Sequence, residues 1–309
     1  MTSRRPSQRA DPAHARQAAP GCLLPLARMR LLITGAGGML GGDVVDAARH
    51  AGHDVVALPR TDLDITDAEA VHAAVADVAP DALVNCAAWT DVDGAEAAEA
   101  LATEVNGDGA GHVAAAAAAA GAFVVSVSTD YVFDGREREP YVESDPTAPL
   151  GAYGRSKLAG ERAVAAAAPE RHAIVRTSWL FGAHGPNFVA TMLRLAGERD
   201  ELTVVDDQVG CPTFTGHLAP ALLAIAENER TGILHVAGSG CCSWWDLARA
   251  TFEAAGHGVR LHPGRTEDLG RPAPRPAWSV LRTERPDAPV LPAWQDGLAD
   301  YLELQGVRA

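Results

Sequence analysis

The fold is decided by the segment Arg30-Leu31-Leu32-Ile33-Thr34-Gly35-Ala36-Gly37-Gly38-Met39-Leu40-Gly41. Its first five residues form a short apolar run with the length of a buried strand. The three glycines Gly35, Gly38 and Gly41 then follow in a G-x-x-G-x-x-G pattern. Apolar residues recur after them at helical spacing, so the motif joins a strand to a helix whose first amides can hold a pyrophosphate. This context, more specific than the glycines alone, predicts a dinucleotide-binding turn.

Short apolar runs alternate with alanine-rich helical segments along the body of the chain. Three further runs have the length and composition of strands: Asp54 to Leu58, Ala82 to Cys86 and Phe123 to Val127. Such alternation predicts an α/β fold of the Rossmann type, a doubly wound parallel sheet with helices on both faces. Ligands bind these sheets beyond the carboxyl ends of the strands, where Asn85 to Thr90 and Ser128 to Gly135 are expected.

Among the 26 lysines and arginines of the chain, only Lys157 is a lysine, and it lies four residues after Tyr153. On a helix this spacing places both side chains on one face. An ammonium favours a neighbouring phenolate, so we expect Lys157 to lower the pKa of Tyr153 toward the working pH. Arginine's planar fork does not replace a compact point charge, which makes the lone lysine an indication of catalysis. Thr129, near the end of the fourth predicted strand, offers a hydroxyl to a substrate oxygen.

Composition excludes several classes of protein. The chain has 309 residues, 47% of them hydrophobic, so it can bury a full core. Its net charge of −14 argues against nucleic-acid binding. It has no run of 18 apolar residues and no C-x-x-C pair, so we expect a cytoplasmic protein with reduced thiols and no membrane span. Its 11 histidines form no H-x-x-x-H pattern, and we predict no metal site.

The chain resembles the extended short-chain dehydrogenase/reductases, and within them the dTDP-4-dehydrorhamnose reductases. The resemblance covers the chain from Met29 nearly to the C-terminus and is carried by Leu63 to Asp67, Val84 to Glu96, Ser128 to Gly135, Tyr153 to Glu161, Arg176 to Trp179, Val205 to Gln208, Pro212-Thr213, Ser243-Trp244 and Arg275-Pro276. The chain departs from the family pattern at two positions, and neither changes the reaction type. Trp89 stands where Tyr or His is usual, and Arg282 replaces the acid that usually follows Ser-Val-Leu.

The resemblance implies NADPH-dependent reduction of a dTDP-4-keto-6-deoxy sugar. The C4 ketone of dTDP-4-dehydro-β-L-rhamnose would become the alcohol of dTDP-β-L-rhamnose, with the proton supplied by Tyr153. The implied catalytic residues are Thr129, Tyr153 and Lys157. The implied cofactor-binding residues are Gly35, Gly38, Met39, Leu40, Gly41, Asp64, Ile65, Ala87, Ala88, Trp89, Tyr153 and Lys157. The implied substrate-binding residues are Thr129, Asp130, Tyr153 and Trp179.

The choice between NADPH and NADH depends on the end of the second predicted strand. Leu58-Pro59-Arg60 offers a cation there in place of the acid that would bind a free 2′-hydroxyl. Arg60 therefore favours NADPH, although it could equally be a solvated surface charge. The use of NADH stays open.

Two other functions within the superfamily compete with reduction. Nucleotide-sugar 4,6-dehydratases need an acid directly after Thr-Asp, and Tyr131 at this position argues against dehydration. The regulatory subunit of methionine adenosyltransferase is similar over the same span and binds a dinucleotide without turning it over, so the motifs do not exclude it. The C4 configuration of the product is also open, as is the oligomeric state, with a homodimer as one option.

We expect two lobes. Residues 29–174 and a return segment at 203–225 would form the dinucleotide-binding lobe, and residues 175–202 and 226–309 a smaller, discontinuous substrate lobe. Residues 1–28 are expected to be a disordered extension. In the substrate lobe, Ser243 is expected to cap a helix that begins with Trp244 and Trp245, both of them expected in the core and not stacked on a base.

Overall fold

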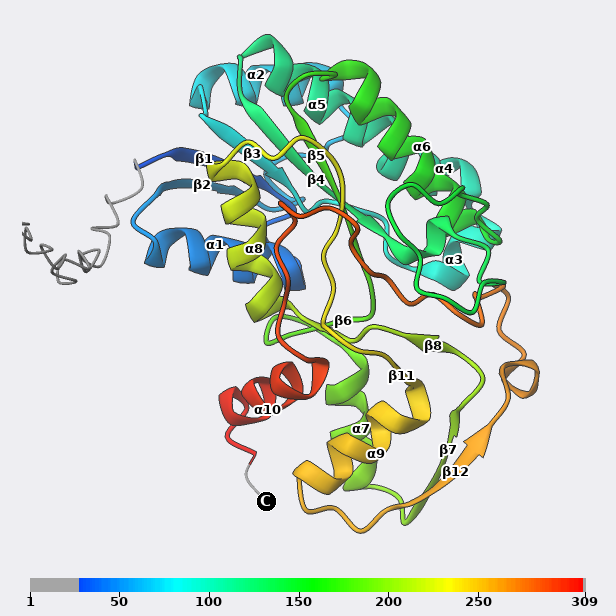
Figure 1. Ribbon diagram of the computed structural model, residues 1–309. Helices are drawn as coiled ribbons and strands as arrows, with labels where there is room; N and C mark the ends of the chain where they lie inside the picture. Colours follow the sequence, from blue (N-terminus) through cyan, green and yellow to red (C-terminus); the bar gives the residue numbers. More distant parts are fainter. Residues whose placement is uncertain (1–27, 308–309) are drawn as a thin grey trace, which may run out of the picture.

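The computed structural model describes residues 28–307, so nearly all of the expected extension lies outside the described residues (Figure 1). The strands are β1 Arg30–Thr34, β2 Asp54–Leu58, β3 Ala82–Asn85, β4 Phe123–Thr129, β5 His172–Thr177, β6 Leu180–Phe181, β7 Glu201–Val205, β8 Val209–Gly210, β9 Thr213–Phe214, β10 Gly232–His235, β11 Cys242–Ser243 and β12 Arg260–Gly264. The α-helices are α1 Met39–His50, α2 Ala68–Val78, α3 Val92–Ala97, α4 Glu99–Thr103, α5 Ala110–Ala119, α6 Ala152–Ala167, α7 Phe188–Ala196, α8 Thr215–Glu227, α9 Trp244–Ala254 and α10 Trp294–Leu304. Shorter helical turns are the π-helical η1 Glu104–Gly109 and the 3₁₀ turns η2 Asp130–Val132 and η3 Thr266–Leu269.

Six parallel strands form the central sheet, in the order β10-β5-β4-β3-β1-β2. The chain passes from β1 to β2 on one side and then crosses to β3 on the other, so the strand order reverses between β1 and β3. The loops after β1, β3 and β4 leave the same edge of the sheet, where ligands bind in doubly wound folds. The predicted α/β fold with a parallel sheet is confirmed (Figure 1).

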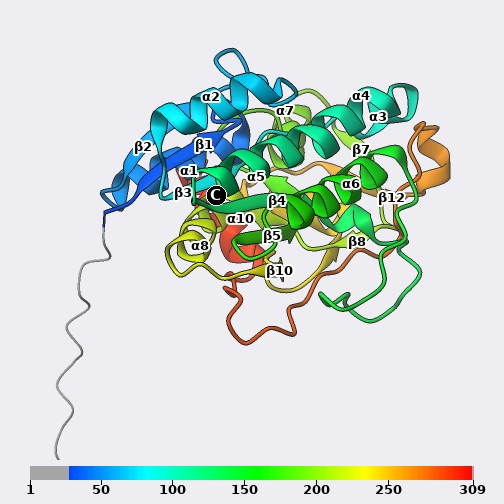
Figure 2. The ribbon, with the colours of Figure 1, turned by 90° about the horizontal axis from the view of Figure 1, so that it is seen from above.

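Helices cover both faces of this sheet (Figures 1 and 2). α1 and α8 pack on one face, whereas α2, α5 and α6 pack on the other. Because side chains alternate along a strand, Leu31 and Ile33 of β1 join the first core and Leu32 joins the second. A strand buried on both faces needs a continuous apolar run, which explains the run of apolar residues in β1.

Small residues bring α5 and α6 close together above the sheet. A Cβ atom at Gly111 would lie 3.1 Å from the Cβ of Ala163, and a Cβ atom at Gly160 would overlap the carbonyl oxygen of Asn106. The alanines of α5 leave room for this approach while still filling the core. The packing fixes α6, which carries the Tyr-x-x-x-Lys pair, against the π-helical turn η1.

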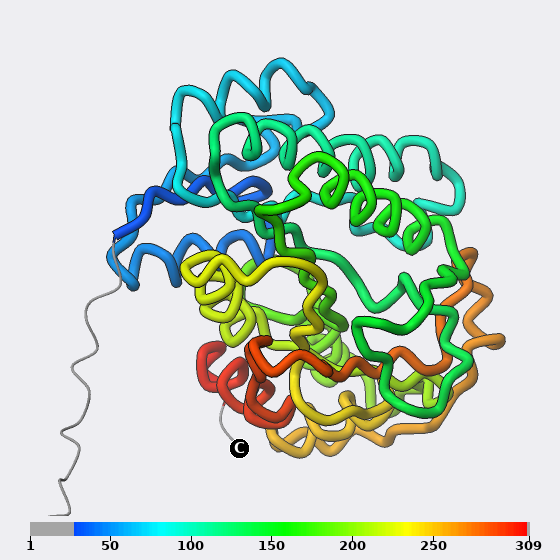
Figure 3. Tube along the Cα trace, turned by 45° about the horizontal axis from the view of Figure 1, so that its top comes forward, coloured from blue at the N-terminus to red at the C-terminus, as the bar shows by residue number. Residues whose placement is uncertain are grey.

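A second region lies below the central sheet in Figure 1. It contains three two-stranded sheets, β6 with β9, β7 with β12 and β8 with β11, together with α7, α9 and α10. Its main core is aromatic and aliphatic and includes Phe181, Val189, Phe214, Leu247, Leu298 and Tyr301. Figure 3 shows the red C-terminal segment beside the yellow segment that follows β10, and two backbone hydrogen bonds between Ser239 and residues 292 and 294 join them.

The expected lobe boundaries need correction at two points. The expected return segment begins inside β7, but β7 pairs with β12 outside the central sheet. β10, which was expected in the substrate lobe, pairs with β5 and forms an edge of the central sheet. The physical reason is burial on both faces, because Leu234 and Ile233 of β10 pack into the two cores on opposite sides of the sheet.

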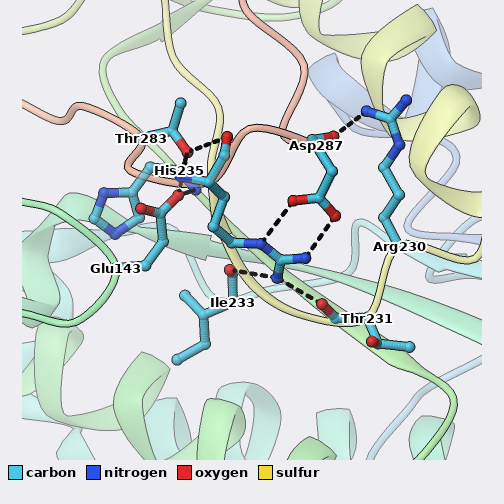
Figure 4. Close-up of polar contacts among 8 residues, drawn as sticks. Glu143, Arg230, Thr231, Ile233, His235, Thr283 and Asp287 are labelled. Atoms are coloured by element: carbon cyan, nitrogen blue, oxygen red, sulfur yellow. Dashed lines mark hydrogen bonds and ion pairs between the residues drawn. The ribbon is translucent and has the colours of Figure 1, made fainter.

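The segment that precedes α10 covers the free edge of β10 (Figure 4). The Arg285 guanidinium donates hydrogen bonds to the carbonyl oxygens of Thr231 at 2.6 Å and Ile233 at 3.1 Å. On the same strand, the backbone amide of His235 donates to the Glu143 carboxylate at 2.8 Å. These contacts satisfy backbone groups that an edge strand leaves unpaired.

None of the helices within residues 28–307 combines the length and the apolar character that a membrane span requires.

Candidate active site

The glycine-rich turn between β1 and α1 has no room for side chains at two of its glycines. Gly35 has a φ of 66°, and a Cβ atom there would lie 2.5 Å from the backbone nitrogen of Ala87. A Cβ atom at Gly41 would overlap the carbonyl oxygen of Gly35. Both glycines are therefore required by the turn and by its close contact with the loop after β3.

Gly38 is the N-cap of α1, and a Cβ atom there would meet only the Gly35 carbonyl oxygen, at 3.2 Å. No side chain caps this helix, and its first turn contains no acid. The amides of Met39, Leu40 and Gly41 lack intrahelical partners, as at any helix start. Together with the positive end of the helix dipole they form a site that fits the pyrophosphate of a dinucleotide.

The region after β2 carries the residues expected near the adenosine. Arg60 is exposed two residues beyond β2, and Asp64, four residues later, is also exposed. The Asp64 carboxylate accepts hydrogen bonds from the amide and hydroxyl of Thr66, at 3.0 and 2.9 Å. These bonds, with a smaller contribution from the Arg60 charge, hold the pKa of Asp64 below its ordinary value. Ile65 is buried in the core between the sheet and the helices α2, α5 and α6.

The loop after β3 is held by a residue that the sequence analysis missed, Asn106. Its side-chain oxygen accepts from the backbone amide of Trp89 at 2.8 Å, and its Nδ2 donates to the Trp89 carbonyl at 3.1 Å. Nδ2 also donates to the Ser156 hydroxyl at 2.9 Å. Ala87 and Ala88 lie half-buried in this loop. Asn106 thus ties the loop after β3 to α6.

Asn106 lies in the π-helical turn η1, which is inserted between α4 and α5. Such one-turn insertions are rare in helices and concentrate at functional sites. The sequence contains a signal for it, since Asn106-Gly107-Asp108-Gly109 interrupts an otherwise alanine-rich helical segment with poor helix formers.

The three residues predicted to be catalytic come from two neighbouring elements. Thr129 is the last residue of β4, and Tyr153 and Lys157 lie one helical turn apart on α6. The Lys157 ammonium donates to the carbonyl oxygen of Val127 in β4 at 2.7 Å. The Thr129 hydroxyl faces the Tyr153 phenol, and a hydrogen bond donated by it would lower the Tyr153 pKa. The ring of Tyr131 packs edge-to-face on Tyr153, with centroids 5.8 Å apart.

The pKa of Tyr153 moves in the direction opposite to our expectation. Burial, followed by the charge of Asp130, raises the Tyr153 pKa to about 12, and the Thr129 hydroxyl only partly opposes this. Lys157 is not among the causes, because its ammonium is directed at Val127 and its own pKa falls to about 8 through burial. A phenol with a raised pKa keeps its proton at neutral pH, which is the form that a proton donor needs.

A buried ion pair between Glu161 and Arg176 lies one helical turn from Lys157. Glu161, one turn further along α6, accepts from Arg176 at 2.9 and 2.7 Å and from the Ser128 hydroxyl at 2.5 Å. The negative charge of Glu161 favours the ammonium form of Lys157 and opposes the effect of burial on its pKa. A cavity of about 10 Å³, lined among others by Asn106, Lys157 and Glu161, has room for about one water molecule.

Trp179, the expected substrate contact, leaves the same edge of the sheet as Thr129. Thr129 and Thr177 are register partners in β4 and β5, and Trp179 follows two residues later. It has a positive φ of 48°, which is rare for a bulky side chain and marks a constrained position. Its indole stacks on that of Trp244, with ring centroids 3.6 Å apart, and it covers Gly210.

The expected helix start at Ser243 is confirmed, because Ser243 and Asp246 form a reciprocal capping box at the beginning of α9. Trp244 and Trp245 are only partly buried, although both pack against the core that contains Phe252. Within residues 28–307 there is no group of three or more His, Cys, Asp or Glu side chains that could hold a metal ion.

The structure therefore brings together Thr129, Tyr153, Lys157 and the loop after β3, at the edge of the sheet where β1 ends. Comparison with known proteins identifies the family of the chain. The family model described as the RmlD substrate binding domain matches residues 29–306. The chain belongs to the RmlD family.

Relatives in the RmlD family cover most of this chain. A protein of Streptomyces griseus named dTDP-4-dehydrorhamnose reductase is 48% identical over 84% of this chain and 88% of its own length. One of Streptomyces niveus, named dTDP-4-keto-6-deoxy-D-glucose reductase, is 46% identical over 82% of this chain and 88% of its own. The crystal structure of dTDP-4-dehydrorhamnose reductase from Bacillus anthracis in complex with NADP has a TM-score of 0.87 and 38% identity, covering 90% of this chain and 99% of that one.

Proposed function

We propose that this member of the RmlD family catalyses the NADPH-dependent reduction of the C4 ketone of dTDP-4-dehydro-β-L-rhamnose to dTDP-β-L-rhamnose. The observation that carries the proposal is the convergence of Thr129, Tyr153 and Lys157 at the same edge of the sheet as the uncapped first turn of α1. Relatives at 46–48% identity with the names given above, and the NADP complex of the Bacillus anthracis enzyme, support the same substrate and cofactor classes.

In this proposal NADPH supplies a hydride when it is bound, and the residues of the chain bind, orient and protonate. The first-turn amides of α1 hold the pyrophosphate, and Lys157 holds a ribose hydroxyl. Tyr153 donates its phenolic proton to the carbonyl oxygen as negative charge develops there. Thr129 donates a second hydrogen bond to the same oxygen. Trp179 offers an apolar face to the sugar nucleotide.

A second substrate of the same class has support from the Streptomyces niveus relative, whose name specifies a 4-keto-6-deoxyglucose derivative. Reduction of that sugar would give a different 6-deoxyhexose, whereas hydride delivery to the opposite face of the dTDP-4-dehydro-β-L-rhamnose ketone would give the C4 epimer of rhamnose. The positions of Thr129 and Tyr153 do not specify which face of the ketone receives the hydride, so the product must be identified directly.

The experiment is to incubate the purified protein with NADPH and dTDP-4-dehydro-β-L-rhamnose, follow absorbance at 340 nm, and determine the product configuration by NMR. We expect stoichiometric oxidation of NADPH and a rhamnose product. A talose product would transfer the assignment to the epimer. Tight NADPH binding without turnover on either keto sugar would refute reductase activity and favour a non-catalytic dinucleotide-binding subunit.

The proposal includes a division of labour between the two regions of the molecule. The central sheet with its flanking helices would bind the dinucleotide, and the region with α7, α9 and α10 would bind the sugar nucleotide. A cytoplasmic location and a homodimer are further parts of the proposal, and light scattering of the purified protein would test the latter.

A further inference from the structure

Asp130 is a buried carboxyl directly beside the proposed catalytic residues. It follows Thr129 in the chain, begins the turn η2 and is only 2% exposed. Its Oδ1 accepts a hydrogen bond from the Thr129 hydroxyl at 3.0 Å. Its Oδ2 is buried and has no hydrogen-bond partner among the described residues. A carboxylate in this position would carry a full charge with one oxygen unsatisfied, which is costly.

The groups that face Asp130 come from several elements. Among the described residues, none of the groups that shift the pKa of its carboxyl is a cation. They are Tyr131 in η2, Tyr153 in α6, Cys211 between β8 and β9, and Ser279 in the segment before α10. Arg275 faces Tyr131, but it is paired with Asp93 at 2.9 Å. Burial raises the pKa of Asp130 to about 7, although the Thr129 hydroxyl and the nearby Ser279 hydroxyl, which makes no well-formed hydrogen bond to the carboxyl, favour the charged form.

The Thr129 hydroxyl has one hydrogen to donate and two lone pairs. One lone pair accepts from the backbone amide of Tyr131 at 3.2 Å. The single hydrogen is given to Asp130 in the arrangement described here, so it is not available to a substrate oxygen. The proposed reaction needs that hydrogen to point at the carbonyl oxygen.

We propose that the protonation state of Asp130 sets the direction in which Thr129 donates its hydrogen bond, and that Thr129 serves the substrate only when Asp130 is protonated. Asp130 is then a positioning residue that acts through Thr129, and this inference rests on the proposed reductase function.

The two states differ in the direction of one hydrogen-bond chain. With Asp130 ionised, Thr129 donates to the carboxylate and presents only a lone pair toward Tyr153 and the substrate. With Asp130 protonated, its hydroxyl donates to Thr129, and the Thr129 hydrogen turns toward the carbonyl oxygen. The proton that ends on the product alcohol comes from Tyr153, and Asp130 keeps its own proton through the reaction.

The test is the pH dependence of the hydride-transfer rate between pH 5.5 and 7.5, measured with saturating substrate and with NADPH or its 4-deuterated form. A group with a pKa of about 7 whose ionised form is inactive lowers the rate about fourfold over this range. Lys157, with a pKa of about 8, titrates mainly above the range. A rate that is flat from pH 5.5 to 7.5 would overturn the proposal.

Two variants identify the group responsible. Asp130→Asn provides an amide donor to Thr129 at every pH and should abolish the fourfold change. Thr129→Val lowers the rate. It should also abolish the fourfold change with pH, because Asp130 acts on the substrate through the Thr129 hydroxyl. In the Thr129→Val background, Asp130→Asn should then have no further effect on the pH profile. A profile unchanged by Asp130→Asn would contradict the proposal.

Unfolding gives a readout that does not depend on activity. A carboxyl whose pKa is raised in the folded state binds more protons there than in the unfolded chain between about pH 4 and pH 7. Its contribution to the free energy of unfolding therefore falls as pH rises through that window. We expect the urea midpoint of the wild type, relative to Asp130→Asn, to be lower at pH 7 than at pH 5. The same difference at both pH values would contradict the titration of Asp130.

The two possible failures are distinguishable. If the wild type forms no product from any dTDP-4-keto sugar, the proposed function fails, whatever the unfolding experiment gives. If product forms and both the pH profile and the unfolding difference are insensitive to Asp130→Asn, only the role of Asp130 fails.

Discussion

The two ends of the Tyr-x-x-x-Lys pair lie in opposite electrostatic surroundings. At the Lys157 end, the buried charges are fully partnered, because Glu161 accepts from Arg176 and Ser128, and Lys157 donates to a strand carbonyl. At the Tyr153 end, buried polar atoms of Asp130 and Thr177 have no hydrogen-bond partner among the described residues. Buried polar groups are normally satisfied, so exceptions need an explanation. The difference indicates a fixed support at the Lys157 end and an incompletely hydrogen-bonded site at the Tyr153 end.

The largest effect should come from the unsatisfied end. Tyr153→Phe removes only the proposed proton donor, so kcat should fall by about 10²- to 10⁴-fold while NADPH binding is retained. Turnover by stopped-flow and cofactor affinity by fluorescence titration measure the two quantities. Tyr131→Phe, which alters the neighbouring phenol that packs on Tyr153, is the matched control and should keep much more activity. A near-normal kcat in Tyr153→Phe would exclude it as the proton donor.

A substitution at the Lys157 end should mainly lower the free energy of unfolding. Glu161→Gln leaves the Arg176 charge buried without its counter-charge, and breaking a buried pair in this way costs about 3–5 kcal/mol. Urea unfolding measures the loss. Glu198→Gln breaks the exposed pair with Arg194 and should cost about 0.5 kcal/mol or less. If both variants lost the same stability, the two ends of the site would not differ as described.

Lys157→Arg tests whether the Lys157 end also contributes to catalysis. The ammonium fits a 2.7 Å contact with Val127 in a buried space, and a planar guanidinium there must displace either itself or its neighbours. A displacement of about 1 Å in a catalytic group costs on the order of 10²-fold in kcat. Arg162→Lys, the reverse exchange on the exposed face of α6, should leave kcat unchanged. Wild-type kinetics in Lys157→Arg would show that the lone lysine has no catalytic role.

The smallest effect is expected far from both ends, at the exposed Arg60. If its guanidinium pairs with the 2′-phosphate, Arg60→Ala should raise the KM for NADPH by about tenfold or less, because solvent weakens the contact. The KM for NADH serves as the internal control and should stay the same. Equal increases for both cofactors would mean that Arg60 supports the adenosine pocket without selecting the phosphate.

Local patterns in the sequence were sufficient for the elements that form through short-range rules. The apolar run of β1, the glycines and the helical spacing after them predict a strand, a turn and a helix, because each depends only on periodicity and backbone freedom. The capping box at Ser243 is equally local. The α/β fold follows from the alternation of such units.

What only the tertiary structure decided depends on burial and on distant partners. The sequence does not show that β10 completes the central sheet while β7 leaves it, because strand partners are non-local. The pKa of Tyr153 rises instead of falling, since burial and the Asp130 charge disfavour the phenolate while the Lys157 ammonium is directed at the Val127 carbonyl. The unsatisfied oxygen of Asp130 likewise exists only because residues far apart in the chain enclose it. Chain pattern therefore determined which groups are present, and packing determined their charge and their partners.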